Sequence, residues 1–141
     1  MKSLRKIRKY LPSILFFSFI VWMIIQADLD KSNPLMRLGR TVPFGDKIGH
    51  FILFGTMALL LNMAIKFKRI HVWRHEFYLG SIIVLCFATI EEFSQLAFQS
   101  RTFDVVDMIF DVLGIITLSS VAFRTIIIRM IDGLKPEHHE K

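Results

Sequence analysis

Residues 91–114 read EEFSQLAFQSRTFDVVDMIFDVLG, and this stretch places charged side chains between two runs that are as apolar as membrane spans. It holds five of the chain's twelve carboxylates. An acid inside a transmembrane segment costs roughly 2.5 to 3.5 kcal/mol on insertion scales, so such residues usually face the interior of a helix bundle and usually have a function. The stretch therefore predicts two membrane helices that form a hairpin with a polar interior.

The composition of the whole chain is that of a small membrane protein. Its 141 residues are 53% hydrophobic, and the mean hydropathy is +0.49. We therefore expect a single membrane domain over residues 1–141. The net charge is +6, but the basic residues lie beside the apolar runs, which is typical of membrane topology and not of a nucleic-acid-binding face. A single cysteine excludes an intramolecular disulfide and a cysteine-rich metal cluster.

Four apolar runs are each long enough to cross a bilayer, which takes about 17 to 25 residues. They are residues 10–27, 48–65, 77–98 and 105–128. These runs predict an all-α fold, a polytopic membrane protein built as a four-transmembrane-helix bundle. The tail at residues 132–141 is expected to be solvated and disordered.

The connectors between the runs differ in character. Proline and glycine interrupt the first one, in which we expect a short interfacial helix around residues 35–40. The second, residues 66–76, is basic, and we interpret its His71 and His75 as solvated residues. The third has six residues, 99–104, which permit only a tight antiparallel connection.

The distribution of positive charge predicts the orientation. Thirteen of the eighteen Lys and Arg residues lie before the first run, in the second connector or after Phe123, and five lie in the other two connectors. Since cytoplasmic loops carry the excess of Lys and Arg, both termini are predicted to be cytoplasmic. The first and third connectors, and the polar stretch beside them, then face outward.

Helix geometry brings the polar residues to matching depths. At a rise of about 1.5 Å per residue, Glu92 and Asp111 each lie about 9 Å below the outer boundary. Gln95 and Asp107 lie about 3 to 5 Å down, and His50 enters from the second run at about 3 Å. Two antiparallel helices thus present their carboxylates to each other at one level.

The polar residues of each helix also share one face, so the direction of their side chains agrees with their matching depths. At about 100° per residue, they span an arc of about 100° on the third run and about 80° on the fourth. Gly114 continues the acidic stripe of the fourth run and would let a neighbouring helix approach closely. The predicted ligand-binding residues are Asp46, Lys47, His50, Glu91, Glu92, Gln95, Arg101, Asp104, Asp107 and Asp111.

The acids of this set outnumber its fixed cations. Six carboxylates face only Lys47 and Arg101. Either the deeper acids hold protons, or a cation or a cationic ligand group completes the site. A divalent cation is one such cofactor, with Glu92, Asp107 and Asp111 as its candidate ligands. Arg101 can pair with a carboxylate or bind an incoming phosphate.

These residues give the chain a resemblance to the VanZ-like family of small bacterial membrane proteins. The family pattern is an Asp-Lys with a following His, then an acid-Glu-x-x-Gln, then Arg, Asp and an Asn followed by Gly. Here the pattern is matched, in order, by Asp46, Lys47 and His50, by Glu91, Glu92 and Gln95, and by Arg101, Asp107 and Gly114. Asp111 stands where the family usually has Asn, which adds an acid to the site.

The resemblance implies a multi-pass protein of the bacterial cytoplasmic membrane. The founding member of the family is linked to low-level resistance to the glycopeptide antibiotic teicoplanin. By resemblance, the chain is expected to belong to the cell envelope and to contact the lipid bilayer. Its partners would be lipid-linked envelope precursors or lipoglycopeptides at the outer leaflet, with a role in antibiotic resistance.

Three functions remain open on the residues alone. The first is a binding module for a lipid headgroup, a cell-wall precursor or a lipophilic antibiotic. The second is a membrane-embedded enzyme acting on a lipid-linked phosphate or acyl substrate, with Glu92, His50 and Asp107 as candidate catalytic residues. The third is a structural latch of interhelical polar contacts. An ion pathway is disfavoured because the inner halves of the runs look apolar.

Overall fold

Helices form most of the chain in the computed structural model, which describes residues 8–29, 31, 34–99, 101–120, 125 and 129–130. In chain order the elements are α2 (Leu11–Asp28), α3 (Pro34–Thr41), α4 (Gly45–Ala64), β1 (Arg69–Val72), β2 (His75–Tyr78), α5 (Leu79–Ser94), the 3-10 helix η1 (Gln95–Ala97) and α6 (Val105–Ser119). Three helical segments are long and apolar enough to cross a membrane: Leu11–Asp28, Gly45–Ala64 and Leu79–Ala97. The prediction of a mostly helical membrane protein is therefore confirmed.

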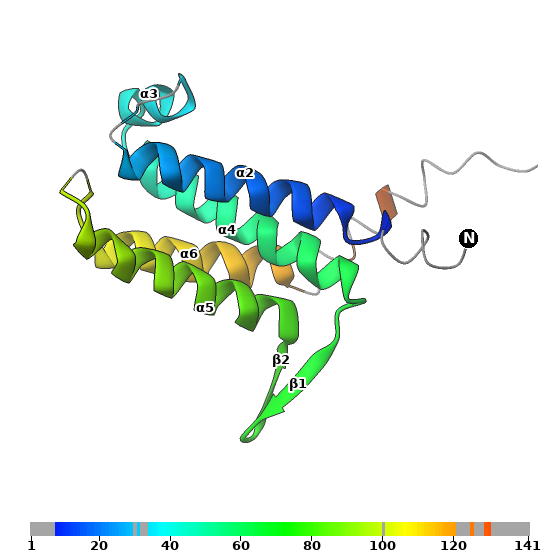
Figure 1. The fold of residues 1–141 in the computed structure, drawn as a ribbon. Coiled ribbons are helices and arrows are strands. Elements are labelled where there is room, and N and C mark those ends of the chain that lie inside the picture. The colour runs from blue at the N-terminus through cyan, green and yellow to red at the C-terminus, as the bar shows by residue number, and fades with distance from the viewer. Residues whose placement is uncertain are drawn as a thin grey trace, which may run out of the picture.

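The long helices lie side by side, and α4 is at the centre of the bundle (Figure 1). It contacts α2, α3, α5 and α6. The core between them consists of Ile20, Phe54, Met57, Ala58, Val84, Ala88 and Ile115. The short helix predicted around residues 35–40 is present as α3, which lies at the end of the bundle where α2 ends and α4 begins.

The closest helix crossing is between α4 and α6, and glycines make it possible. A Cβ atom added to Gly55 would lie 2.7 Å from the carbonyl oxygen of Gly114. One added to Gly114 would lie 2.9 Å from the carbonyl carbon of Phe51 and closer still to its oxygen. Real Cβ atoms essentially never come within 3.0 Å of such atoms. The predicted close approach at Gly114 is thus confirmed, and α4 is the helix that makes it.

The connector between α4 and α5 is more ordered than its sequence suggests. It forms an antiparallel hairpin in which Arg69 pairs with Tyr78 and Val72 with His75. Trp73 occupies the turn with φ of 60° and is 99% exposed. The hairpin projects from the end of the bundle opposite α3 (Figure 1).

His71, which we interpreted as a solvated residue, has a side chain that is 76% exposed, and it also takes part in charged contacts on the hairpin. Arg69 Nη1 lies 2.8 Å from Glu76 Oε2, and His71 Nε2 lies 2.8 Å from Glu76 Oε1. The hydrogen bond from Arg69, together with the charge of His71, lowers the pKa of Glu76. The hairpin also corrects the third predicted span, because Phe77 and Tyr78 belong to β2 and the helix begins at Leu79.

The other three predicted spans agree with helices of the structure over different parts of their length. The runs at 10–27 and 48–65 correspond to α2 and α4, and α4 begins early enough to include Asp46 and Lys47 in its first turn. The fourth run corresponds to α6 up to Ser119. Of its remaining residues, 120–128, the structure describes only Ser120 and Thr125, and the tail at 132–141 lies outside the described residues.

A small polar cluster lies deep in the bundle, where the sequence suggested only apolar groups. The fully buried Asn62 donates from Nδ2 to Ser81 Oγ at 2.9 Å and to Ser119 Oγ at 3.2 Å. Gly80 lies directly against the Asn62 side chain, where a Cβ atom would collide with it. The three hydrogen-bonding residues come from α4, α5 and α6, so the cluster ties these helices together away from the acidic end.

Candidate functional site

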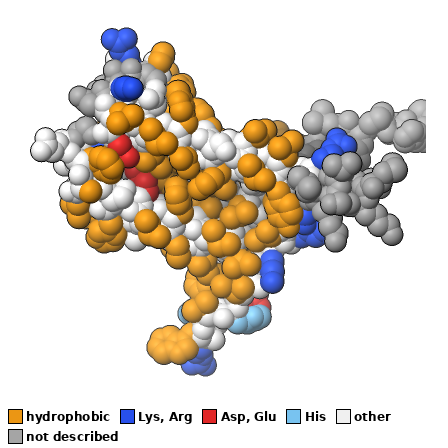
Figure 2. All heavy atoms as spheres, in the orientation of Figure 1, with side chains coloured by type: hydrophobic (Ala, Val, Ile, Leu, Met, Phe, Trp, Pro, Cys, Tyr) orange, Lys and Arg blue, Asp and Glu red, His pale blue; other side chains and the backbone are white. Residues whose placement is uncertain are grey.

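The predicted site residues gather at the α3 end of the bundle. In the space-filling view, a small group of acidic side chains is visible there among hydrophobic ones, beneath α3 (Figure 2). Glu91, Glu92, Gln95, Asp107 and Asp111 are all buried. The helix pairing therefore places them between the helices, and the arrangement separates into three connected groups.

The first group is centred on Lys47 in the first turn of α4. Its ammonium nitrogen donates to Asp104 Oδ2 at 2.8 Å, to Asp107 Oδ1 at 2.8 Å and to Asp46 Oδ2 at 3.2 Å. Lys47 is thus the cation that joins the start of α4 to the start of α6. Asp46 is the outermost partner, with 62% of its side chain exposed.

Asp104 has a second role as the N-cap of α6, because its side chain accepts a hydrogen bond from the Val106 backbone nitrogen at 2.8 Å. The hydrogen bond from Lys47 and the capping bond both favour the ionised carboxylate. They lower the pKa of Asp104 below the ordinary value of 3.8. The residue therefore fixes the start of α6 as a charged group.

The second group is centred on Arg101, whose two terminal nitrogens contact two different carboxylates. Its Nη2 lies 3.0 Å from Glu91 Oε1, and its Nη1 lies 3.6 Å from Asp28 Oδ1 at the end of α2. Glu91 also accepts from the Gln95 amide at 3.2 and 3.3 Å. Asp28 was not among the predicted residues, although an acid at the end of the first run lies at the same membrane boundary. Through it, Arg101 ties α2 to α5.

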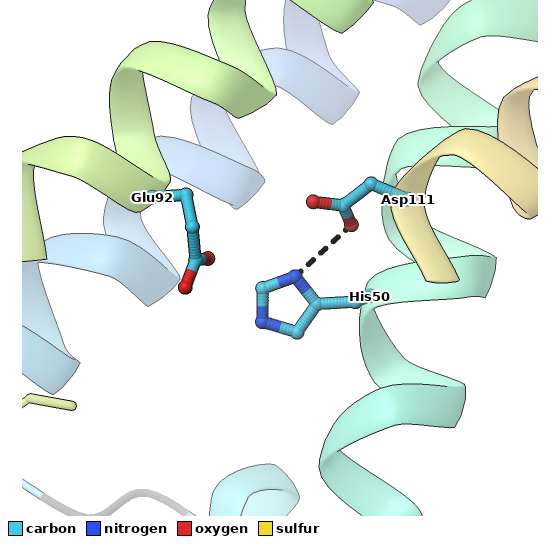
Figure 3. Close-up of side chains that lie close together, drawn as sticks. All are labelled: His50, Glu92 and Asp111. Atoms are coloured by element: carbon cyan, nitrogen blue, oxygen red, sulfur yellow. Dashed lines mark hydrogen bonds and ion pairs between the residues drawn. The ribbon is translucent and has the colours of Figure 1, made fainter. Parts of the chain in front are cut away.

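The third group consists of His50, Glu92 and Asp111, one from each of α4, α5 and α6 (Figure 3). His50 Nδ1 lies 3.0 Å from Asp111 Oδ1, and its Nε2 lies 3.9 Å from Asp107 Oδ2. Glu92 Oε2 accepts from the Gln95 amide and its Oε1 from the Asp104 backbone nitrogen, both at 2.8 Å. The predicted matching depth of Glu92 and Asp111 agrees with this geometry, since one donor atom from each of the three residues lies within 4.8 Å of the others.

A pocket of about 330 Å³ opens beside these groups. One part of its wall is polar and includes Asp46, His50, Glu91, Gln95 and Arg101. The apolar part is made by Ile20, Met23, Ile24 and Ala27 of α2, Leu35 and Met36 of α3, and Leu53 and Phe54 of α4. Nothing in the sequence marks this apolar wall, because it consists of ordinary span residues that only helix packing selects.

The family assignment rests on most of the chain. Residues 2–128 match the family model described as VanZ/LLP1. The chain belongs to the VanZ/LLP1 family. The resemblance seen in the sequence is thereby confirmed, and the bundle described above is that of a VanZ/LLP1 membrane protein. Neither a curated protein nor a solved structure matches the chain.

In this VanZ/LLP1 protein the ten predicted site residues all lie in the three groups, so the sequence pattern located a real spatial cluster. Their role in ligand binding stays a prediction. The geometry adds two details. Arg101 pairs with the carboxylates of Glu91 and Asp28, which is the first of the two alternatives predicted for it, and the group whose donor atoms lie within 4.8 Å of one another is His50, Glu92 and Asp111.

Proposed function

We propose that this VanZ/LLP1 protein binds an amphiphilic molecule of the bacterial cell envelope at the outer leaflet of the cytoplasmic membrane. The observation that supports this proposal is the pocket, whose lining combines polar residues such as His50, Glu91 and Gln95 with the apolar side chains of α2. Ligand pockets commonly combine an apolar lining with a few polar groups that fix orientation, and their volumes start near 300 Å³. A lipid-like chain would lie against α2 and α4, and the headgroup would lie against His50 and Gln95.

The position of α3 supports entry from the membrane surface. Leu35 and Leu38 are three residues apart on α3 and are both more than half exposed. An amphipathic helix with such a face lies in the interface between water and lipid. Since Leu35 and Met36 also line the pocket, α3 would form its border at the level of the headgroups.

The proposed orientation follows from the positive charge of the chain. Thirteen of the eighteen Lys and Arg residues lie before the first run, in the second connector or after Phe123, and a topology of four spans with both termini in the cytoplasm puts these segments on the cytoplasmic side. A topology reporter fused at Lys68, in the α4–β1 connector, should therefore be cytoplasmic. A reporter found outside at this position would contradict both the orientation and an outer-leaflet site.

The amphiphile could come from three sources that share this chemistry: a membrane phospholipid, a lipid-linked cell-wall precursor or an acylated glycopeptide such as teicoplanin. Native mass spectrometry of the full chain in lipid nanodiscs, with each of the three added in turn, distinguishes them. We expect one adduct class to be retained in a one-to-one complex. Loss of all three under conditions that preserve the folded protein would contradict the proposal.

Gly49 offers a way to fill the pocket without disturbing the helices. It lines the pocket, and a Cβ atom added to it meets nothing within 4 Å. Gly49→Leu should therefore abolish the adduct and keep the fold. The matched control is Leu113→Phe on the outer surface of α6, which adds similar bulk away from the pocket and should leave the adduct unchanged.

A second candidate is an enzyme acting on the same bound molecule. It is favoured by His50, whose two ring nitrogens face carboxylates of Asp111 and Asp107 at 3.0 and 3.9 Å. A histidine oriented by a carboxylate is a common general base. Turnover of a lipid-linked phosphate or acyl compound that is lost in His50→Ala and in Glu92→Gln would establish catalysis. Binding without turnover supports the module, and a loss of stability alone in these variants supports a structural latch.

A further inference from the structure

The third group of the site has the composition of a metal centre, with donor atoms spaced about 1 Å too widely to share an ion. His50, Glu92 and Asp111 each offer one donor atom, and these atoms lie within 4.8 Å of one another. Donors bound to one ion at about 2.0 to 2.2 Å lie roughly 3.0 to 3.6 Å apart, so a closure of about 1 Å completes the contact. His50 Nδ1 and Asp111 Oδ1 already lie at such a separation, 3.0 Å.

Asp111 carries an oxygen that the protein leaves unsatisfied. Its side chain is completely buried, and its Oδ2 has no hydrogen-bond partner within the part of the chain that the structure describes. Figure 3 shows this second carboxylate oxygen on the side that faces Glu92. An unsatisfied buried polar group costs about 1 to 3 kcal/mol, and more when it is charged. A bound cation between Asp111 and Glu92 would remove this cost.

Charge balance points to the same place. Lys47 is shared by Asp46, Asp104 and Asp107, and Arg101 is shared by Glu91 and Asp28. Glu92 and Asp111 are the two fully buried acids, and among the described residues neither is paired with a lysine or an arginine. With His50 neutral, as it is in a metal ligand, one divalent cation would balance the charge of these two carboxylates.

We propose that His50, Glu92 and Asp111 bind one divalent transition-metal ion of the Zn²⁺ or Mn²⁺ class. An imidazole nitrogen among the donors favours these ions over Mg²⁺ and Ca²⁺, which prefer all-oxygen sites. His50 Nδ1 is the ligand, which leaves Nε2–H to donate toward Asp107 Oδ2. This carboxylate–histidine–metal arrangement is usual around metal ligands. Three protein ligands also leave coordination positions open for a further group.

The ion would change what the pocket can hold. His50 lines the pocket, so an ion on its ring nitrogen would add positive charge to a wall in which Arg101 faces three acids, Asp46, Glu91 and Asp107. A phosphate-bearing headgroup could then bind where carboxylates alone would repel it. Metal binding itself needs no amphiphile, so this inference and the proposed function are tested separately.

The test uses the full chain in detergent, stripped with a chelator and titrated with Zn²⁺, Mn²⁺, Co²⁺ and Mg²⁺. We expect one ion per chain and a visible absorption band for Co²⁺ bound to a nitrogen ligand. His50→Ala and Glu92→Gln should each weaken binding by at least about tenfold, and Asp111→Asn, which keeps the shape of the side chain, should weaken it while preserving the fold.

A surface pair of the same composition provides the control. The double variant His71→Ala/Glu76→Gln removes a histidine and a carboxylate from the hairpin and should leave the stoichiometry and the affinity unchanged. Binding that survives both Glu92→Gln and Asp111→Asn would overturn the proposal. So would equal affinity for Mg²⁺ and Zn²⁺, or the absence of Zn²⁺ and Mn²⁺ binding in the folded wild-type protein.

Discussion

Replacing Gly114 by alanine should separate α4 from α6 and loosen the site above them. The added Cβ atom would lie 2.9 Å from the Phe51 carbonyl carbon and 3.0 Å from its Cα. These are backbone atoms that no rotamer change can move, so the helices themselves must shift. Overpacking of this kind typically costs about 1 to 3 kcal/mol, and occasionally more. The higher helix propensity of alanine offsets this cost by up to about 1 kcal/mol. We therefore expect a net loss of roughly 0 to 2 kcal/mol in the free energy of unfolding.

Gly49→Ala is the matched control, because Gly49 lies on α4 in the same pair of helices and its Cβ atom would meet nothing within 4 Å. It should keep the gain in helix propensity without the overpacking, so the two variants should differ in the free energy of unfolding by the overpacking cost, about 1 to 3 kcal/mol. Circular dichroism during denaturant unfolding in detergent measures this difference. If Gly114→Ala proved as stable as Gly49→Ala, the close α4–α6 crossing, and the contact of His50 with Asp111 that depends on it, would be wrong.

Three further substitutions test the polar groups. Lys47→Met should lower the free energy of unfolding by about 2 to 3 kcal/mol, because it leaves the buried Asp107 without its cation; an unchanged stability would refute that role. Asn62→Ala should cost about 1 to 3 kcal/mol by breaking the polar cluster that joins three helices, measured in the same unfolding assay. Asp104 has a lowered pKa in the folded state, so its contribution is present above pH about 4 and is lost as the pH falls through that lowered value. Asp104→Asn should therefore reduce the loss of stability on acidification, and an identical pH profile would contradict this.

The clustering of the acidic residues can be predicted from the sequence, because acids in a membrane span are energetically costly and therefore stand out from the apolar residues around them. Acids in apolar runs must face one another, and the rise and twist of a helix then fix their depth and side. Glu92 and Asp111 can be matched in this way from their positions in the chain alone. Gly114 can be assigned to a close contact for a similar reason, although its partner helix cannot.

The parts that the sequence does not predict depend on tertiary packing. The hairpin is made of short strands whose charged residues look like any solvated connector, so only the pairing of Arg69 with Tyr78 reveals it. Asn62 is a single polar residue, and its partners Ser81 and Ser119 are too common to mark a site. The apolar wall of the pocket is likewise indistinguishable from lipid-facing residues of α2 until the helices are placed.

Photoaffinity labelling of the folded protein tests the central proposal most directly, because it reports where the chain of the bound amphiphile lies. The probe is the amphiphile retained in the nanodisc experiment, carrying a photoreactive group in its apolar chain. We predict labels on Met23, Ile24 and Leu53 that disappear when unlabelled amphiphile is added and in Gly49→Leu. Labels spread evenly over outward-facing residues such as Ile109 and Leu113, without competition, would show ordinary lipid contact and would contradict a binding site between α2 and α4.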